Sequence, residues 1–165
     1  MENVRERVLN ALKNKDFKDL REIFETIPTI DIAESIDDVE DVTLLVYVFR
    51  VVSKDYTGDF FAELTADQQE LILKSFSDKE LFALLENSFA DDIVDTIEEM
   101  PANVVNRILR VAPADMRKDI NQLLNYNDNT AGSVMTTEYI EMRENVKVSD
   151  AIASIRRNGR DAETI

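Results

Sequence analysis

Helix-start signals recur at a nearly constant interval through the middle of the chain. Thr65 and Ser77 each stand three residues before a Gln or a Glu, which is the capping-box pattern. Pro101 and Pro113 follow at the same rhythm, and proline is favoured in the first turn of a helix. Intervals of 12, 11, 12 and 12 residues result when the helix starts are placed at Thr65, Ser77, Ser88, Met100 and Ala112.

This spacing leaves room for helices of two to three turns joined by minimal turns. Helices this short do not persist alone in water, so they must stack on their neighbours. Apolar residues at helical spacing continue the pattern upstream, over Val4–Leu12, Phe17–Ile27, Ile30–Ile36 and Val42–Val52. We therefore predict an all-α fold, a superhelical solenoid of short helices whose handedness the pattern does not set. An irregular helical bundle is the alternative.

The composition excludes several classes of function. The 165 residues include 34 acidic and 19 basic side chains, a formal charge of −15, which repels nucleic acid and anionic lipid headgroups. The chain has no His and no Cys, so thiol and histidine catalysis and zinc sites are excluded. With only three glycines, and with no phosphate-binding loop and no substrate cleft, we expect no enzyme activity. Because of the negative charge, we also expect no nucleic-acid partner. The longest apolar run, Val42–Phe49, is far shorter than a membrane span.

The acidic surplus is concentrated in two stretches that lack basic residues. Eight acidic residues and no Lys or Arg lie between Arg21 and Arg50, and seven lie between Lys79 and Arg107. Like charges at about 8 Å in water cost roughly 0.5 kcal/mol per pair, so the repulsion among unpaired acids lowers the stability of each stretch. Whether four acids of the first stretch take part in any binding is left open by the sequence: Asp31, Asp37, Asp38 and Asp41.

One predicted helix, over about residues 90–99, has its acids on a single face. Asp91, Asp95 and Glu98 fall in one stripe, and Ile93 and Ile97 lie opposite. A solvated acidic face is the ordinary interpretation of such a pattern. The functional alternative is a site for a hard divalent cation such as Mg²⁺, held by carboxylates and water.

After Leu124 the helical periodicity ends. The turn-rich segment 126–133 precedes a predicted strand, Tyr139–Met142, and a helix capped by Ser149 and closed by Gly159. Thr164–Ile165 begins a second predicted strand. Such a strand–helix–strand beginning cannot bury its own apolar face, so we expect the chain to be a piece of a longer polypeptide.

The junction Leu123–Thr136, LLNYNDNTAGSVMT, resembles the passage from the amino-terminal helical domain to the first CBS domain in MgtE-type magnesium transporters. In that family a Leu-Leu-x-Tyr stretch precedes (Ser/Thr)-Ala-Gly-x-x-Met-Thr. The matching positions here are Tyr126, Thr130, Ala131, Gly132, Met135 and Thr136, and Arg156, Arg157 and Asp161–Ile165 continue the match. The resemblance implies a helical superhelix over 1–126, a connecting segment over 127–136, and a truncated α/β start of a CBS domain over 137–165.

The resemblance also implies a function. The family's cytosolic region senses Mg²⁺: bound cations hold acidic faces together and close the pore, and carboxylate repulsion separates them at low Mg²⁺. The weak regulatory Mg²⁺ sites would use Asp91 and Asp95, which match an aspartate pair of the family, and Asp59, at a position that is often Glu. For Asp59, beside Gly58 near a helix start, capping is a sufficient explanation by itself.

The partners implied are the rest of the chain's own CBS region, a transmembrane pore domain and a second copy in a homodimer. The segment would lie at the cytoplasmic face of the cell membrane. The alternative function is an acidic protein-interaction solenoid fused to CBS modules, in which the acidic face binds a basic partner.

Overall fold

The computed structural model describes residues 4–127, 129–159 and 162. Helices make up the regular secondary structure of these residues, as predicted, and we find no extended strand among them. The first half contains α1 Val4–Asn14, α2 Phe17–Thr26, α3 Thr29–Ser35, α4 Val42–Val51, the 3₁₀ helix η1 Lys54–Tyr56 and α5 Thr57–Ala62. The second half contains α6 Ala66–Ser75, α7 Asp78–Leu85, α8 Ala90–Glu98, α9 Ala102–Val111, α10 Ala114–Leu123, η2 Ala131–Val134 and α11 Val148–Asn158.

The residues that precede the helices form a more regular series than the sequence suggests. Apart from Tyr56, which precedes α5 directly after η1, the N-cap residues stand 12 positions apart from residue 16 to residue 113, with a single interval of 13 before residue 41. The members of this series are Asp16, Pro28, Asp41, Ser53, Thr65, Ser77, Phe89, Pro101 and Pro113. The repeat therefore begins about 50 residues earlier than the capping boxes indicate.

The capping boxes at Thr65 and Ser77 are confirmed, with both reciprocal hydrogen bonds present. The three later helix starts were predicted one residue too early, because Phe89, Pro101 and Pro113 are themselves the N-caps. Proline fixes φ but leaves ψ extended here, at 143° for Pro101, so it precedes the first turn instead of occupying it. The hydroxyl of Ser88 donates to the Leu84 carbonyl of the preceding helix and is not available as a cap.

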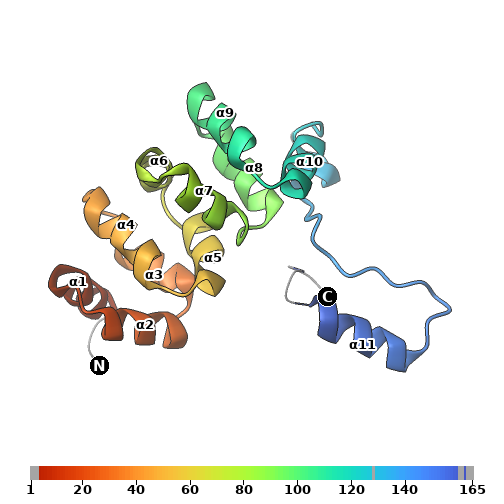
Figure 1. Cartoon of the computed structure of the whole chain (residues 1–165), viewed down its shortest axis with the longest axis horizontal. Helices are drawn as coiled ribbons and strands as arrows, with labels where there is room; N and C mark the ends of the chain where they lie inside the picture. Colours follow the sequence, from red (N-terminus) through yellow and green to blue (C-terminus); the bar gives the residue numbers. More distant parts are fainter. Residues whose placement is uncertain (1–3, 128, 160–161, 163–165) are drawn as a thin grey trace.

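The helices stack in chain order, most of them against the second helix that follows (Figure 1). The contacts α1–α3, α2–α4, α3–α5, α4–α6, α5–α7, α7–α9 and α8–α10 form the framework of the stack. An arrangement in which each unit contacts only near neighbours along the sequence is the defining property of a solenoid. The predicted all-α fold is confirmed for the helices α1–α10, which stack on near neighbours in chain order.

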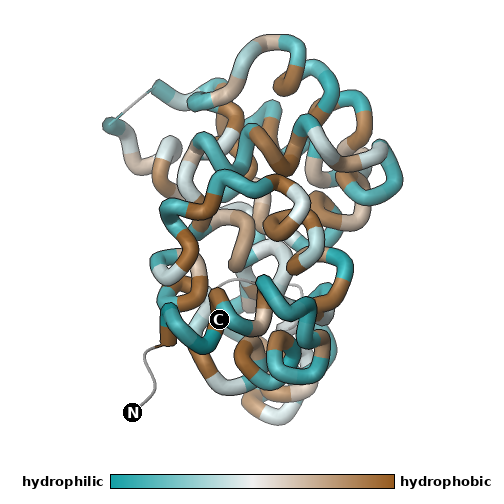
Figure 2. Tube along the Cα trace, turned by 90° about the vertical axis from the view of Figure 1, so that its left-hand side faces the viewer, coloured by the Kyte–Doolittle hydropathy of each residue, from teal (hydrophilic) through white to brown (hydrophobic). Residues whose placement is uncertain are grey.

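One continuous core runs along the stack from α1 to α10. Figure 2 shows hydrophobic and hydrophilic residues alternating along the turns, as expected for helices that bury one face each. Aromatic rings fill its centre, where Phe60 meets Phe24 edge-on and Phe49 at an angle. Not every aromatic ring is buried: Phe17 and Phe82 are 58% and 40% exposed.

The carbonyl ends of several helices are capped by side chains from neighbouring helices. Only three glycines occur in the chain, so the common glycine C-cap is largely absent. Long side chains donate instead. Arg5 reaches the end of α3, Arg21 the end of α4, Gln68 the loop after α3, Gln69 the end of α5 and Arg107 the end of α6.

The chain beyond α10 differs from the stack and from its prediction. An extended segment leads away to α11, which has no buried residue (Figure 1). The predicted strand Tyr139–Met142 is wrong for the described residues, where Tyr139 makes only an isolated bridge, because a strand needs neighbouring strands to persist. Lys147, not Ser149, is the N-cap of α11, while Gly159 closes it as predicted. Thr164–Ile165 lies outside the described residues.

No helix within the described ranges is long and apolar enough to cross a membrane.

Gln68 is the sharpest test of the cross-helix capping. Its Nε2 donates to the carbonyls of Ile36 at 2.6 Å and Val39 at 3.0 Å, and the side chain is buried. Gln68→Leu keeps most of the volume but leaves these carbonyls unsatisfied and also removes the weak 3.4 Å bond from the Thr65 amide, so we expect the free energy of unfolding to fall by about 1–3 kcal/mol. Urea denaturation followed by circular dichroism measures this. The matched change Gln122→Leu, at an exposed site on α10, should alter stability by less than about 0.5 kcal/mol, and equal effects would contradict the role of Gln68.

Candidate metal-sensing face

The acidic helix forms as predicted and is α8. Phe89 is extended at the N-cap position, and Ile93 and Ile97 are buried against the stack. Asp95 is exposed, whereas Asp91 is half-buried, with its Oδ1 atom shielded from solvent. The two acids that match the family's pair therefore differ in environment, and only Asp95 is fully presented to the surface.

Asp59 is exposed in the first turn of α5, a helix that contacts α7 and α8. The N-cap residue of α5 is Tyr56, whose side chain makes no capping hydrogen bond, and Asp59 lies in the first turn, where a carboxylate is favourable. The preceding residue, Gly58, is buried at the closest approach between α5 and the turn before α8. A Cβ at Gly58 would lie 1.8 Å from the Asn87 carbonyl oxygen, which only glycine permits.

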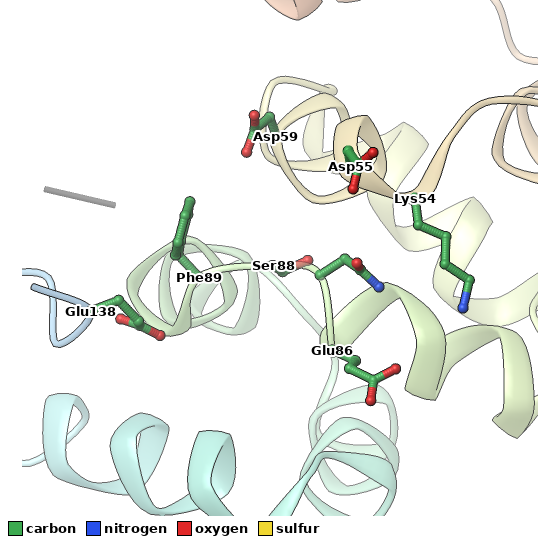
Figure 3. Close-up of a pocket in the computed structure, with 8 residues that line it drawn as sticks. Lys54, Asp55, Asp59, Glu86, Ser88, Phe89 and Glu138 are labelled. Atoms are coloured by element: carbon green, nitrogen blue, oxygen red, sulfur yellow. The ribbon is translucent and has the colours of Figure 1, made fainter. Parts of the chain in front are cut away.

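A cavity of about 730 Å³ opens beside Asp59 (Figure 3). Four carboxylates and one ammonium group line it: those of Asp55, Asp59, Glu86, Glu138 and Lys54. Figure 3 shows Asp55 and Asp59 on one side of the opening and Glu86, Phe89 and Glu138 on the other. The structure therefore joins Asp59 to three acids that the sequence analysis did not single out as ligands, while Asp91 and Asp95 are not part of this lining.

Within the described part of the chain, no group of three or more acidic side chains is arranged to hold a metal ion. Asp59, Asp91 and Asp95 lie on two helices that touch, but they do not form one coordination site. Mg²⁺ is usually held by one or two protein carboxylates with water completing the shell. Each of these acids could therefore supply only part of a cation site, and a second surface would have to supply the rest.

The first acidic stretch is not the unpaired cluster that its sequence suggests. Arg5 of α1 pairs with Asp37 at 3.5 Å and Asp38 at 2.6 Å, and Asp41 caps α4 through the Thr43 amide. The basic partners come from about 30 residues upstream, so a count within the stretch misses them. These three acids therefore have structural roles in the stack.

Glu138 reaches the start of α8 from 48 residues further along the chain. Its Oε1 accepts a hydrogen bond of 3.0 Å from the Ala90 amide, and its Oε2 accepts from the Thr137 hydroxyl at 2.8 Å. The carboxylate also affects α10: burial, together with the charge of Glu138, raises the pKa of Asp119. No local sequence signal identifies this contact, because Glu138 follows the region of helical periodicity.

The fold and these side chains together define a class: an acidic α-superhelical domain whose only candidate ligand groups for a metal are oxygen atoms. A sequence model of the family described as "MgtE intracellular N domain" matches residues 27–129, more than half of the chain. The chain belongs to this family.

One curated relative is the magnesium transporter MgtE of Thermus thermophilus, 33% identical over 79 residues, which make up 46% of this chain and 17% of the transporter. The solved soluble part of a magnesium transporter matches with a TM-score of 0.85 at 23% identity, over 99% of this chain and 64% of that one. The solved cytosolic domain of the Mg²⁺ channel MgtE, in complex with ATP, matches with a TM-score of 0.80 at 27% identity, over 98% and 66%. The chain thus spans about a sixth of the curated relative and just under two thirds of each solved chain.

Gly58 should be the least replaceable glycine of this face. Gly58→Ala places a methyl group against the Asn87 backbone, so α5 must move away from the turn before α8. We expect a loss of about 1–3 kcal/mol in the free energy of unfolding, measured by urea denaturation, despite the better helix propensity of alanine. Gly132→Ala is the comparison, because the methyl group there meets the ring of Tyr126, an exposed side chain that can rotate aside. A larger loss at Gly132 than at Gly58 would contradict this assignment.

Asp119 should make stability depend on pH. Its raised pKa means that the ionised form is disfavoured in the folded chain, so the charge costs stability at about pH 7. Asp119→Asn should therefore raise the thermal midpoint at about pH 7, and the gain should shrink as the pH falls toward the ordinary value of 3.8, where the wild type takes up the proton itself. Thermal unfolding across this range measures the difference.

Asp67→Asn is the control for Asp119. It removes the same charge at an exposed site in the first turn of α6, where an acid is favourable, so its thermal midpoint should fall slightly. A gain at Asp119 that did not vary with pH would contradict the titration argument.

Proposed function

We propose that this chain is the Mg²⁺-sensing part of a magnesium transporter, lying at the cytoplasmic face of the cell membrane. Membership of the MgtE intracellular N domain family supports the proposal, as does the name of the Thermus relative. The observation that carries it is that α8 has an exposed acid, Asp95, and begins at an acid-lined cavity, with no complete metal site among the described residues. Half-sites of this kind suit a cation that bridges two surfaces.

In this mechanism Asp91 and Asp95 on α8 and Asp59 on α5 are the weak Mg²⁺ ligands. Bound Mg²⁺ bridges these acids to acids of a second surface and draws the surfaces together, and removal of Mg²⁺ leaves like charges that repel. The docked state holds a pore domain closed, and the separated state releases it. The full-length protein acts as a homodimer.

The energetics favour several sites over one. Moving a gate from 1:99 to 99:1 requires about 5.5 kcal/mol of differential binding. One site filled at ten times its dissociation constant supplies about 1.4 kcal/mol. Roughly four weak sites acting together are therefore needed, which fits dispersed carboxylates better than one tight cage.

We further propose the division of the chain into a helical superhelix over 1–126, a connecting segment over 127–136 and the start of a CBS domain over 137–165. The two solved neighbours align with nearly the whole chain, including α11, and extend beyond the aligned part. The absence of any buried residue in α11 supports the view that the apolar face of this unit is completed by further chain.

The test uses the full-length protein and protease protection as a function of Mg²⁺ concentration. Asp91→Asn plus Asp95→Asn keeps the side-chain shapes and removes two charges, so the Mg²⁺ concentration needed for protection should rise several-fold. Glu34→Ala plus Glu40→Ala removes the same charge at two exposed sites outside the proposed face and should leave the midpoint unchanged.

Two outcomes would count against the proposal. An unchanged midpoint in the Asp91 and Asp95 variant would remove these residues from the sensor. Protection of the wild type that did not respond to millimolar Mg²⁺ would favour the alternative, an acidic protein-interaction solenoid fused to CBS modules.

A further inference from the structure

Helix α8 begins without a cap of its own. Its N-cap residue is Phe89, whose side chain has no acceptor and makes no capping hydrogen bond. The first amide groups of a helix have no intrahelical partner and carry the positive end of the helix dipole. An acceptor from elsewhere, above all a carboxylate, is therefore stabilising at this position.

Glu138 supplies that acceptor. Its Oε1 lies 3.0 Å from the Ala90 nitrogen, and Thr137 and Thr136 hold the other oxygen at 2.8 and 3.4 Å. The hydroxyl of Thr136 in turn accepts from the Glu138 amide at 3.1 Å. Two threonines thus fix the carboxylate in the orientation that caps α8.

The same residue lies where the two parts of the chain meet. On one side Glu138 lines the acidic cavity with Asp59 and Phe89, and on the other it lines a smaller hollow with Ser154 and Asn158 of α11. The chain between α10 and α11 is extended, and α11 itself buries no residue. The Glu138 side chain therefore links the segment beside α11 to the helix that carries Asp91 and Asp95.

We propose that Glu138 is a positioning residue that couples the segment before α11 to α8 by capping it. The coupling sets the orientation of the proposed sensor helix relative to the unit that follows the superhelix. This inference deepens the proposed function, but the contact itself exists without Mg²⁺ and is tested without it.

The experiment is hydrogen exchange by mass spectrometry on the whole chain in a chelating buffer. Glu138→Ala should accelerate exchange on the order of tenfold in peptides that cover the start of α8 and residues 136–139. The reason is that the substitution removes the charge-assisted hydrogen bond that joins these two segments. Peptides from α1–α4 should not change, which separates local release from global unfolding.

Two further variants define the mechanism. Glu138→Gln retains an oxygen that can accept from the Ala90 amide, so it should keep most of the protection that Glu138→Ala loses. Glu141→Ala, at an exposed acid three residues away, should match the wild type. Equal exchange at α8 in Glu138→Ala and wild type would overturn the proposal, as would a loss in Glu138→Gln as large as in Glu138→Ala.

Because these measurements are made without Mg²⁺, a negative result would refute the capping of α8 by Glu138 and leave the proposed Mg²⁺-sensing function standing. Conversely, an absent Mg²⁺ response in the protease assay would leave the capping of α8 by Glu138 unaffected.

Discussion

The ends of the helices are the constraint on which this structure depends. A helix of about ten residues leaves four amides and four carbonyls unsatisfied, so nearly every residue of a short helix belongs to one end or the other. At a 12-residue repeat with almost no glycine, the turns cannot satisfy these groups alone. Arginine and glutamine side chains from neighbouring helices complete the task, as Gln68 does after α3 and Arg107 does at the end of α6.

This arrangement makes local and tertiary structure interdependent. Each helix needs its neighbours both to bury its apolar face and to satisfy its terminal carbonyls, so a shift of one helix disturbs the ends of another. Some of the arginines used in this way also form ion pairs with acids. Arg5, for example, donates to the Ser35 carbonyl and pairs with Asp37 and Asp38.

The distribution of those basic residues gives the two acidic stretches different meanings. The first is held by Arg5 and by the cap at Asp41, and so contributes to the fold. On α8, by contrast, none of the ion pairs found among the described residues involves Asp95, Glu98 or Glu99. These acids of α8 are therefore outside the ion pairs of the described residues, as are Glu25, Asp31 and Glu34 of the first stretch.

Much of the stack could be predicted from the sequence because its signals are local. The capping boxes at Thr65 and Ser77 and the apolar spacing of α1–α4 each depend on residues within one turn of each other. The errors arose where a distant group decides the outcome. The amide at the start of α8 is capped by Glu138, and the strand at Tyr139 lacks partner strands within the described residues.

The same distinction applies to the candidate site. The stripe of Asp91 and Asp95 follows from helical geometry, but the cavity of Asp55, Asp59, Glu86 and Glu138 depends on how α5 meets the turn before α8. That meeting is made possible by Gly58, whose sequence context gives no sign of a close backbone approach. The sequence therefore predicts which acids share one face of a helix, but it does not predict which acids of different helices lie close together.

Incomplete sites are an advantage under the proposed function. A domain that held a full set of ligands would bind Mg²⁺ whether or not it was docked, and a ligand with equal affinity for two states shifts neither. Dispersed carboxylates bind well only when a second acidic surface completes their coordination, so the binding energy is differential. The repulsion between those surfaces then sets the Mg²⁺ concentration at which docking occurs. A domain built with acids on α5 and α8 but without a complete cage has the properties that such a sensor requires.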